Sequence, residues 1–121
     1  MARVPIVCIG GILVASVQEE LYDRDALRLQ EELTAGLEDG GARGVLIDLS
    51  SVQMVDSFLG RLLHDVAASA RLMGAETVIV GIQPAVAITL VELGLGLSGI
   101  HTALDSDKGF AFLRCRLGQR R

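Results

Sequence analysis

Residues 45–74 have the sequence VLIDLSSVQMVDSFLGRLLHDVAASARLMG, which contains a strand pattern, a loop and a helix pattern in turn. Val45–Leu49 is apolar except for one acid, which is typical of a strand covered on both faces, or on one face and by its neighbouring strands. A polar loop follows, and from Phe58 apolar residues recur at spacings of three and four up to Gly74. A buried strand that leads through a loop into an amphipathic helix indicates an α/β protein.

The same alternation extends to both sides of this segment. Near the N-terminus, two runs rich in β-branched residues flank Gly10-Gly11, which predicts a tight β-hairpin. The other predicted elements, in chain order, are strands Arg3–Ile9 and Ile12–Val17, a helix capped by Asp23 and closed by Gly40-Gly41, strand Thr77–Ile82, a helix from Pro84 to Gly94, a weak strand at Ile100–Ala103, and a helix capped by Asp105 or Ser106 that runs through Leu117. We expect one α/β domain over residues 1–121, with a mixed, mostly parallel sheet, an N-terminal hairpin, about four helices and a frayed basic end at about 118–121.

The composition indicates a folded chain with more apolar surface than one small core can bury. Apolar residues make up 50% of the 121 residues, while aromatics are only 3%, so the excess consists of Leu, Val, Ile and Ala. A net charge of -4 is too small and the hydrophobicity too high for a disordered chain. The apolar excess of so small a chain favours self-association or a protein partner.

The charge is unevenly distributed along the chain. Residues 19–39 hold eight acids against Arg24 and Arg28, whereas residues 108–121 hold five bases and no acid. One interpretation is that the acidic segment is a solvated helix face and the basic segment a frayed chain end. The other is that the two segments attract each other between neighbouring subunits. The overall negative charge and the scarcity of aromatic rings argue against a nucleic-acid partner.

Sites for metals, cofactors and catalysis find little support in the sequence. Cys8 and Cys115 are too few and too far apart for a disulfide scaffold or a zinc site, so we expect two buried thiols in a reducing cytoplasm. Neither His64 nor His101 belongs to a ligand or catalytic motif, and we expect both to be structural or solvated. The uncharged runs are interrupted by glycine and proline, so no membrane span is predicted.

Asp56 and Ser57 stand where the loop after the buried strand gives way to the helix. Either side chain can accept a hydrogen bond from the free amides of the first helical turn, and capping alone would explain both residues. The same position exposes a serine to a kinase and places a phosphate at the positive end of the helix dipole. Both interpretations remain open from the residues alone.

Three segments together resemble the STAS-domain anti-sigma-factor antagonists, and among them most closely the small scaffold subunits of stressosomes. The segments are VLIDLS at 45–50, MVDSF at 54–58 and GIQPAVAITLVELG at 81–94. The resemblance extends over almost the whole chain, in order and with matching element lengths. It implies a STAS fold without catalytic activity, cofactor or metal.

The resemblance also implies a function. Ser57 would be the single phosphorylation site, with Asp56 and Phe58 near the docking surface. The chain would sequester a GHKL-type serine kinase in a cytoplasmic stressosome, together with a sensor STAS paralogue that carries an N-terminal sensory domain. Phosphorylation would release the kinase, and a PP2C-type phosphatase would reset the serine.

Two classes of function remain as alternatives. The chain could be a simpler antagonist that binds an anti-sigma kinase directly, although the GIQP run favours the stressosome type. An enzyme with Ser57 as nucleophile would need a base, and His64 lies two helical turns away, roughly 10 Å along the axis. A nucleotide-binding STAS module is not supported, because no phosphate-binding glycine loop precedes a helix.

Overall fold

The computed structural model describes residues 5–18, 23–39, 41–94 and 100–118. These residues form a five-stranded sheet in the order β1-β2-β3-β4-β5, together with helices α1 to α4. The elements are β1 (Ile6–Ile9), β2 (Ile12–Ser16), α1 (Asp23–Glu38), β3 (Gly44–Asp48), α2 (Ser57–Leu72), β4 (Glu76–Val80), α3 (Pro84–Glu92), β5 (His101–Ala103) and α4 (Ser106–Gly118).

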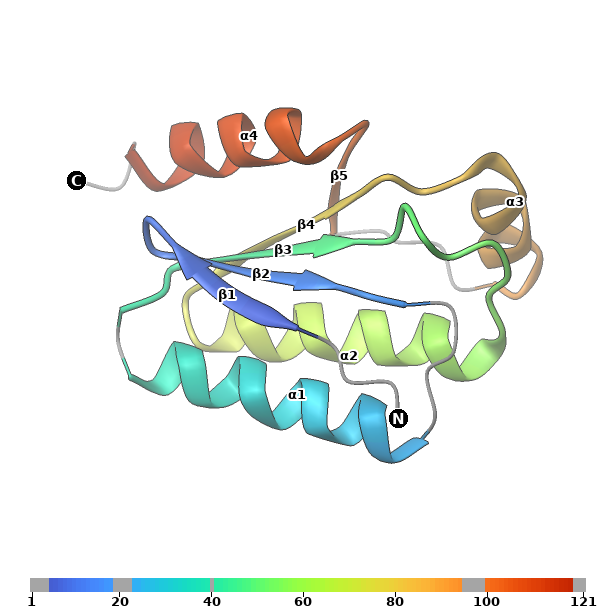
Figure 1. Ribbon diagram of the computed structural model, residues 1–121, viewed down its shortest axis with the longest axis horizontal. Coiled ribbons are helices and arrows are strands. Elements are labelled where there is room, and N and C mark those ends of the chain that lie inside the picture. The colour runs from blue at the N-terminus through green and yellow to red at the C-terminus, as the bar shows by residue number, and fades with distance from the viewer. Residues whose placement is uncertain (1–4, 19–22, 40, 95–99, 119–121) are drawn as a thin grey trace.

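The sheet separates two helical layers (Figure 1). Helices α1 and α2 cover one face, α4 covers the other, and α3 lies beyond the end of the sheet. Strands β2 to β5 are parallel and β1 is antiparallel to β2, as the sequence predicted. The hairpin turn requires positive φ at both central residues, and Gly10 and Gly11 supply φ angles of 57° and 81°.

Strand β3 occupies the centre of the hydrophobic core. Val45 and Ile47 belong to the large cluster between the sheet and helices α1 and α2, whereas Leu46 belongs to a smaller cluster beneath α4. All three side chains have no exposed surface. The prediction of a strand covered on both faces is therefore confirmed, and it explains why this segment is continuously apolar.

Some details differ from the sequence-based prediction. The fourth strand ends at Val80, two residues earlier than predicted, because Gly81 leaves the extended conformation with φ +73°. Helix α1 ends at Glu38, and Gly40 lies outside the described residues. Of the predicted frayed end at about 118–121, Gly118 is the last residue of α4, and residues 119–121 lie outside the described residues, as do residues 19–22 of the acidic segment.

The prediction of two buried thiols is wrong, because Cys8 and Cys115 are both exposed. Cys8 lies on β1, which among the described strands pairs with β2 alone. Cys115 follows Leu113 by two residues, and two residues turn a helix by about 200°, so Cys115 faces away from the side on which Leu113 is buried. In the ranges given above, no helix is both long and apolar enough to cross a membrane.

Candidate functional site

The site is built around the first turn of α2. Asp56 is the N-cap, with extended backbone angles, and its Oδ1 accepts a hydrogen bond of 2.9 Å from the backbone N–H of Leu59. Ser57 is the first helical residue and its side chain is exposed. Of the two residues that the sequence offered as caps, Asp56 provides the side-chain cap, and Ser57 is presented to solvent beside it.

The loop that leads to Ser57 is held by hydrogen bonds at its beginning. Asp48, the last residue of β3, accepts a 2.9 Å hydrogen bond at Oδ1 from the backbone N–H of Ser50. The side-chain amide of Gln83 donates a 2.8 Å hydrogen bond to the carbonyl oxygen of Ser50. Val52 is buried, and its backbone N–H donates to the carbonyl of Leu49 at 2.9 Å. These contacts give the loop a defined path from β3 to the cap.

Gly81 allows the loop after β4 to approach this path closely. A Cβ added at Gly81 would lie 2.9 Å from the Cβ of Ser50 and 3.1 Å from Oδ1 of Asp48. The positive φ of +73° is a second reason for glycine here. The two loops, one before α2 and one before α3, therefore form a single packed unit at the carboxyl ends of β3 and β4.

Apolar side chains surround Ser57 in the sequence and reach the surface. Met54 is 82% exposed and Phe58 is 41% exposed, whereas Val55 between them packs against the main core cluster. An exposed methionine and a half-exposed aromatic ring are residues that protein interfaces favour. The sequence neighbours of Ser57 therefore bring two apolar side chains of this kind to the surface.

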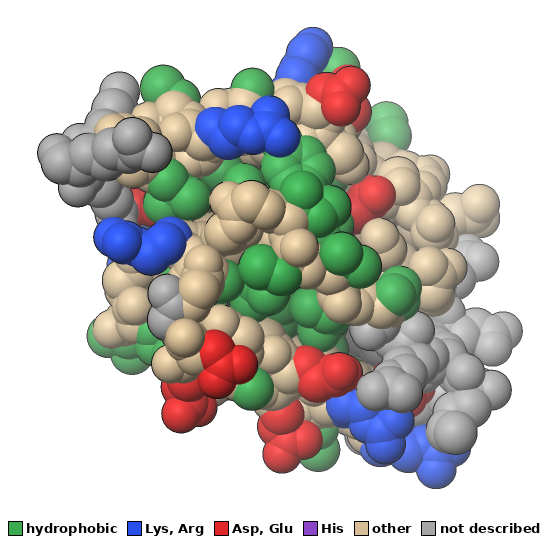
Figure 2. All heavy atoms as spheres, turned by 60° about the vertical axis from the view of Figure 1, so that its left-hand side comes forward, with side chains coloured by type: hydrophobic (Ala, Val, Ile, Leu, Met, Phe, Trp, Pro, Cys, Tyr) green, Lys and Arg blue, Asp and Glu red, His purple; other side chains and the backbone are tan. Residues whose placement is uncertain are grey.

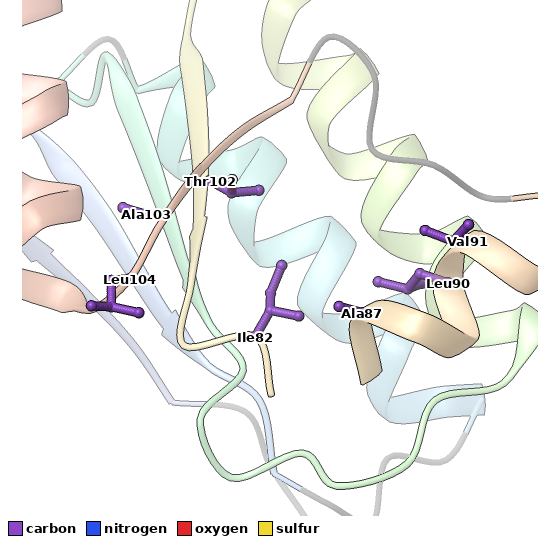
Figure 3. Close-up of a pocket in the computed structure, with 7 residues that line it drawn as sticks. All are labelled: Ile82, Ala87, Leu90, Val91, Thr102, Ala103 and Leu104. Atoms are coloured by element: carbon purple, nitrogen blue, oxygen red, sulfur yellow. The ribbon is translucent and has the colours of Figure 1, made fainter. Parts of the chain in front are cut away.

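An apolar groove of about 500 Å³ lies between α3 and the segment that contains β5 (Figure 3). Its lining is Ile82, Ala87, Leu90, Val91, Thr102, Ala103 and Leu104. Ile82 connects the groove to the loop that carries Gln83. The lining residues that the structure describes carry no charged side chain.

The histidines lie outside this site. His64 is exposed on α2, with its Nδ1 3.8 Å from Oδ1 of Asp65. The ring of His101 packs against Phe112, and its Nε2 lies 3.3 Å from Oε1 of Glu76. The first contact joins β5 to α4, and the second joins β5 to β4. No group of three His, Cys, Asp or Glu side chains within the described ranges is arranged to hold a metal ion.

Residues 3–108 match the family model of the STAS domain. The chain belongs to the STAS domain family. Its STAS domain has the sheet order, hairpin and helices described above, and the loop-to-helix junction at Asp56-Ser57 lies inside the matched range. The resemblance noted in the sequence is thereby confirmed.

Solved structures resemble this STAS domain over nearly its full length. A serine-to-glutamate variant of RsbS from Moorella thermoacetica is 37% identical, with a TM-score of 0.85 over 98% of this chain and 99% of that one. A chain from a structure of the stressosome, described as a signal integration and transduction hub, is 38% identical, with a TM-score of 0.83 over 93% of this chain and 98% of that one.

A sequence relative points to the same group of proteins. The RsbT co-antagonist protein RsbRA of Bacillus subtilis (strain 168) is 34% identical over 84 residues, which cover 69% of this STAS domain. This chain spans 31% of the length of RsbRA, so the likeness concerns one part of that relative.

Sequence reasoning did not identify the residues that support the site. The sequence indicates no supporting role for Gln83, Ser50 or Gly81, which lie in the segments that resemble the STAS family. Their mutual contact is a tertiary feature. A signal was present in Gly81, because an isolated glycine inside a strand pattern, here the predicted strand Thr77–Ile82, often marks a bend or a close backbone approach.

Proposed function

We propose that this chain is an RsbS-like, non-catalytic scaffold subunit of a bacterial stressosome, and that phosphorylation of Ser57 releases a GHKL-type serine kinase from it. The observation that carries the proposal is the placement of Ser57, exposed at the start of α2 beside the exposed Met54 and Phe58. The similarity to RsbS over 98% of the chain supports the scaffold role.

The cap determines what a phosphate on Ser57 would do. Asp56 already occupies the backbone N–H of Leu59, so a phosphate would gain that amide only by displacing the carboxylate. The phosphate would therefore add negative charge beside an existing one at the docking surface. The positive end of the α2 dipole stabilises anions there, so the domain itself should remain folded.

The electrostatic change is large enough for a switch. A phosphoserine carries about -1.5 to -2 charges at neutral pH and three strong acceptor oxygens. A shift of the kinase from micromolar to millimolar affinity requires about 4 kcal/mol. One unpaired charge that is trapped between packed apolar surfaces supplies an energy of that order.

The proposed role implies specific partners and a location. The scaffold would assemble with copies of itself and with RsbR-like STAS paralogues that carry sensory N-terminal domains. A PP2C-type phosphatase would remove the phosphate from Ser57. All of these components would work in the cytoplasm.

The direct test is incubation of the full chain with a GHKL-type serine kinase from the same genome and ATP, followed by peptide mass mapping. We expect one phosphate, on Ser57. Modification of Ser50, Ser51 or Thr89 with Ser57 untouched would overturn the assignment. Binding assays should show that Ser57→Ala retains the kinase in the presence of ATP, while Ser57→Asp folds but binds more weakly.

A size measurement separates the stressosome role from that of a simple antagonist. The chain is mixed with an RsbR-like paralogue and passed over a size-exclusion column, before and after addition of kinase and ATP. We expect a particle much larger than a dimer, from which the kinase leaves on phosphorylation. A chain that binds the kinase but forms no particle with the paralogue would instead be a direct antagonist.

A further inference from the structure

The groove between α3 and the segment that contains β5 has the size of a site for a small molecule. Its volume of about 500 Å³ lies within the range of about 300 to 1,000 Å³ that is usual for ligand pockets. Figure 3 shows side chains of α3 on one side, those of residues 102–104 on the other, and Ile82 between them. Three segments of the chain therefore converge on one apolar hollow.

Apolar side chains reach the surface on both walls of this groove. Helix α3 carries a single charged residue, Glu92, among its nine residues. A helix that is apolar on nearly all sides is usually buried on all sides. Here Val91 is 72% exposed at the groove, and Leu104 on the opposite wall is 74% exposed. A ligand between the two walls would remove this apolar surface from water, which favours binding.

The lining decides which class of ligand fits. Six of the seven described lining residues are aliphatic, and Thr102 supplies the one hydroxyl group among them. A charged group inside the groove would lose its water without gaining a partner from these residues. A neutral polar group can exchange a hydrogen bond with the hydroxyl of Thr102, which both donates and accepts. The lining therefore favours a molecule that is mostly hydrocarbon and uncharged.

The groove is small for a protein partner. A standard protein–protein interface uses about 20 to 30 residues on each side, whereas seven described residues line this groove. A single small molecule is therefore the occupant that the size and the chemistry of the groove favour.

Ile82 joins the groove to the loop that leads to Ser57. It stands between Gly81, which lies against Ser50, and Gln83, whose side-chain amide donates to the carbonyl oxygen of Ser50. An occupant that contacts Ile82 therefore contacts the segment that fixes this loop. Binding to an ordered segment costs less entropy than binding to a loose one, so a ligand should favour the state in which the bond between Gln83 and Ser50 is formed.

We propose that this groove binds one small, uncharged and mostly hydrocarbon molecule, and that its occupation holds the loop before Ser57 more firmly. By linkage, the bond between Gln83 and Ser50 strengthens binding by the same factor by which the ligand strengthens the bond. The inference concerns the groove and its contact with the loop, and it is independent of the proposed role of Ser57.

The fluorescence of N-phenylnaphthylamine, an uncharged apolar probe, tests the site in the full chain. We expect a saturable rise with one probe bound per chain. Decanol should displace the probe at a concentration at least about tenfold lower than decanoate, because the two have the same chain length and differ in charge. The absence of a saturable rise, or equal displacement by the two competitors, would overturn the proposal.

Matched substitutions on α3 locate the bound probe. Ala87 lines the groove, while Ala85 is exposed on the same helix outside the described lining. Ala87→Glu should weaken probe binding by at least about tenfold, because it brings a charge into the apolar wall. Ala85→Glu should leave probe binding unchanged, and circular dichroism checks that both variants are folded. Equal effects of the two substitutions would overturn the groove as the binding site.

A second apolar surface needs its own control. Figure 2 brings the end of the molecule opposite α3 toward the viewer, and it shows hydrophobic side chains between basic ones above and acidic ones below. Strand β1 leads to the hairpin turn at this end and exposes Val7 and Ile9. Val7→Ser should leave probe binding unchanged. Loss of binding in Val7→Ser, with Ala87→Glu unaffected, would place the probe on the hairpin and overturn the proposal.

Hydrogen exchange tests the effect of the ligand on the loop. With decanol bound, the amides at 50–57 should exchange more slowly, whereas those of β1 should be unchanged. Gln83→Ala should bind decanol severalfold more weakly and should lose this slowing, because the bond to Ser50 is absent. Binding of decanol that leaves exchange at 50–57 unchanged would overturn the coupling to the loop.

Both measurements use the chain alone and so are separate from the kinase experiment. Phosphorylation of Ser57 in a chain that binds no probe would reject this inference alone. Probe binding by a chain that no kinase modifies would reject the proposed switch alone.

Discussion

The side-chain amide of Gln83 donates a 2.8 Å hydrogen bond to the carbonyl oxygen of Ser50, a residue 33 positions earlier in the chain. This bond joins the loop before α3 to the loop before α2, at the carboxyl ends of adjacent parallel strands. The position of Ser57 therefore depends on a residue from a different loop. Four predictions concern this unit and the surface that it presents.

Gln83→Ala removes the bond between the loops. Because one hydrogen bond is worth about 1 kcal/mol, the free energy of unfolding should fall by about that amount. Hydrogen exchange of the amides at 50–57 should become faster. The control Gln53→Ala removes the same side chain from an exposed position in the loop and should leave both measurements near wild type. Equal exchange in the two variants would show that Gln83 does not hold the loop.

Gly81→Ala should destabilise the domain through both backbone strain and a clash with Ser50. Gly74 is the matched control, because its φ of +83° resembles that of Gly81 while nothing lies within 4 Å of an added Cβ. Gly74→Ala should therefore cost only the left-handed conformation, about 1–2 kcal/mol. Thermal or urea unfolding of Gly81→Ala should show a clearly larger loss. Equal losses would mean that the loops move apart without cost.

Asp56→Ala and Asp56→Asn separate capping from charge. Alanine should cost about 1 kcal/mol of stability, and asparagine should restore it because the two side chains cap about equally well. Asparagine should nonetheless alter the rate of Ser57 phosphorylation, since it removes the neighbouring negative charge. Asp105 accepts a 2.9 Å hydrogen bond from the N–H of Lys108 at the start of α4, so Asp105→Asn is a control that should leave phosphorylation unchanged. If Ser57 is phosphorylated at the wild-type rate in Asp56→Asn, then Asp56 acts only as a helix cap.

Met54→Ser tests the apolar surface next to Ser57. The side chain is almost fully exposed, so the free energy of unfolding should change by no more than about 0.5 kcal/mol. We expect the kinase to bury Met54 on docking, so its affinity, measured by titration calorimetry, should fall severalfold. Leu104→Ser is the control, because Leu104 is exposed at the groove beside β5. A loss of affinity in the control alone would move the docking surface to that groove.

Much of the architecture was predictable because its signals are local. Hydrophobic spacing identified α2, the continuous apolar run identified the buried β3, and Gly10-Gly11 identified the hairpin turn. The parallel sheet followed from the alternation of strands and helices. The junction at Asp56-Ser57 was found for the same reason, since a helix start has a composition of its own.

The properties that failed or were missed are those that depend on distant segments. The exposure of Cys8 and Cys115 could not be inferred from their own neighbours, because it depends on β1 being an edge strand and on which side of α4 is buried. The bond between Gln83 and Ser50 exists because β3 and β4 lie side by side. Periodicity and turn chemistry act within a few residues and so determine the elements, whereas solvent exposure and hydrogen-bond partners are decided only when the sheet brings its strands and loops together.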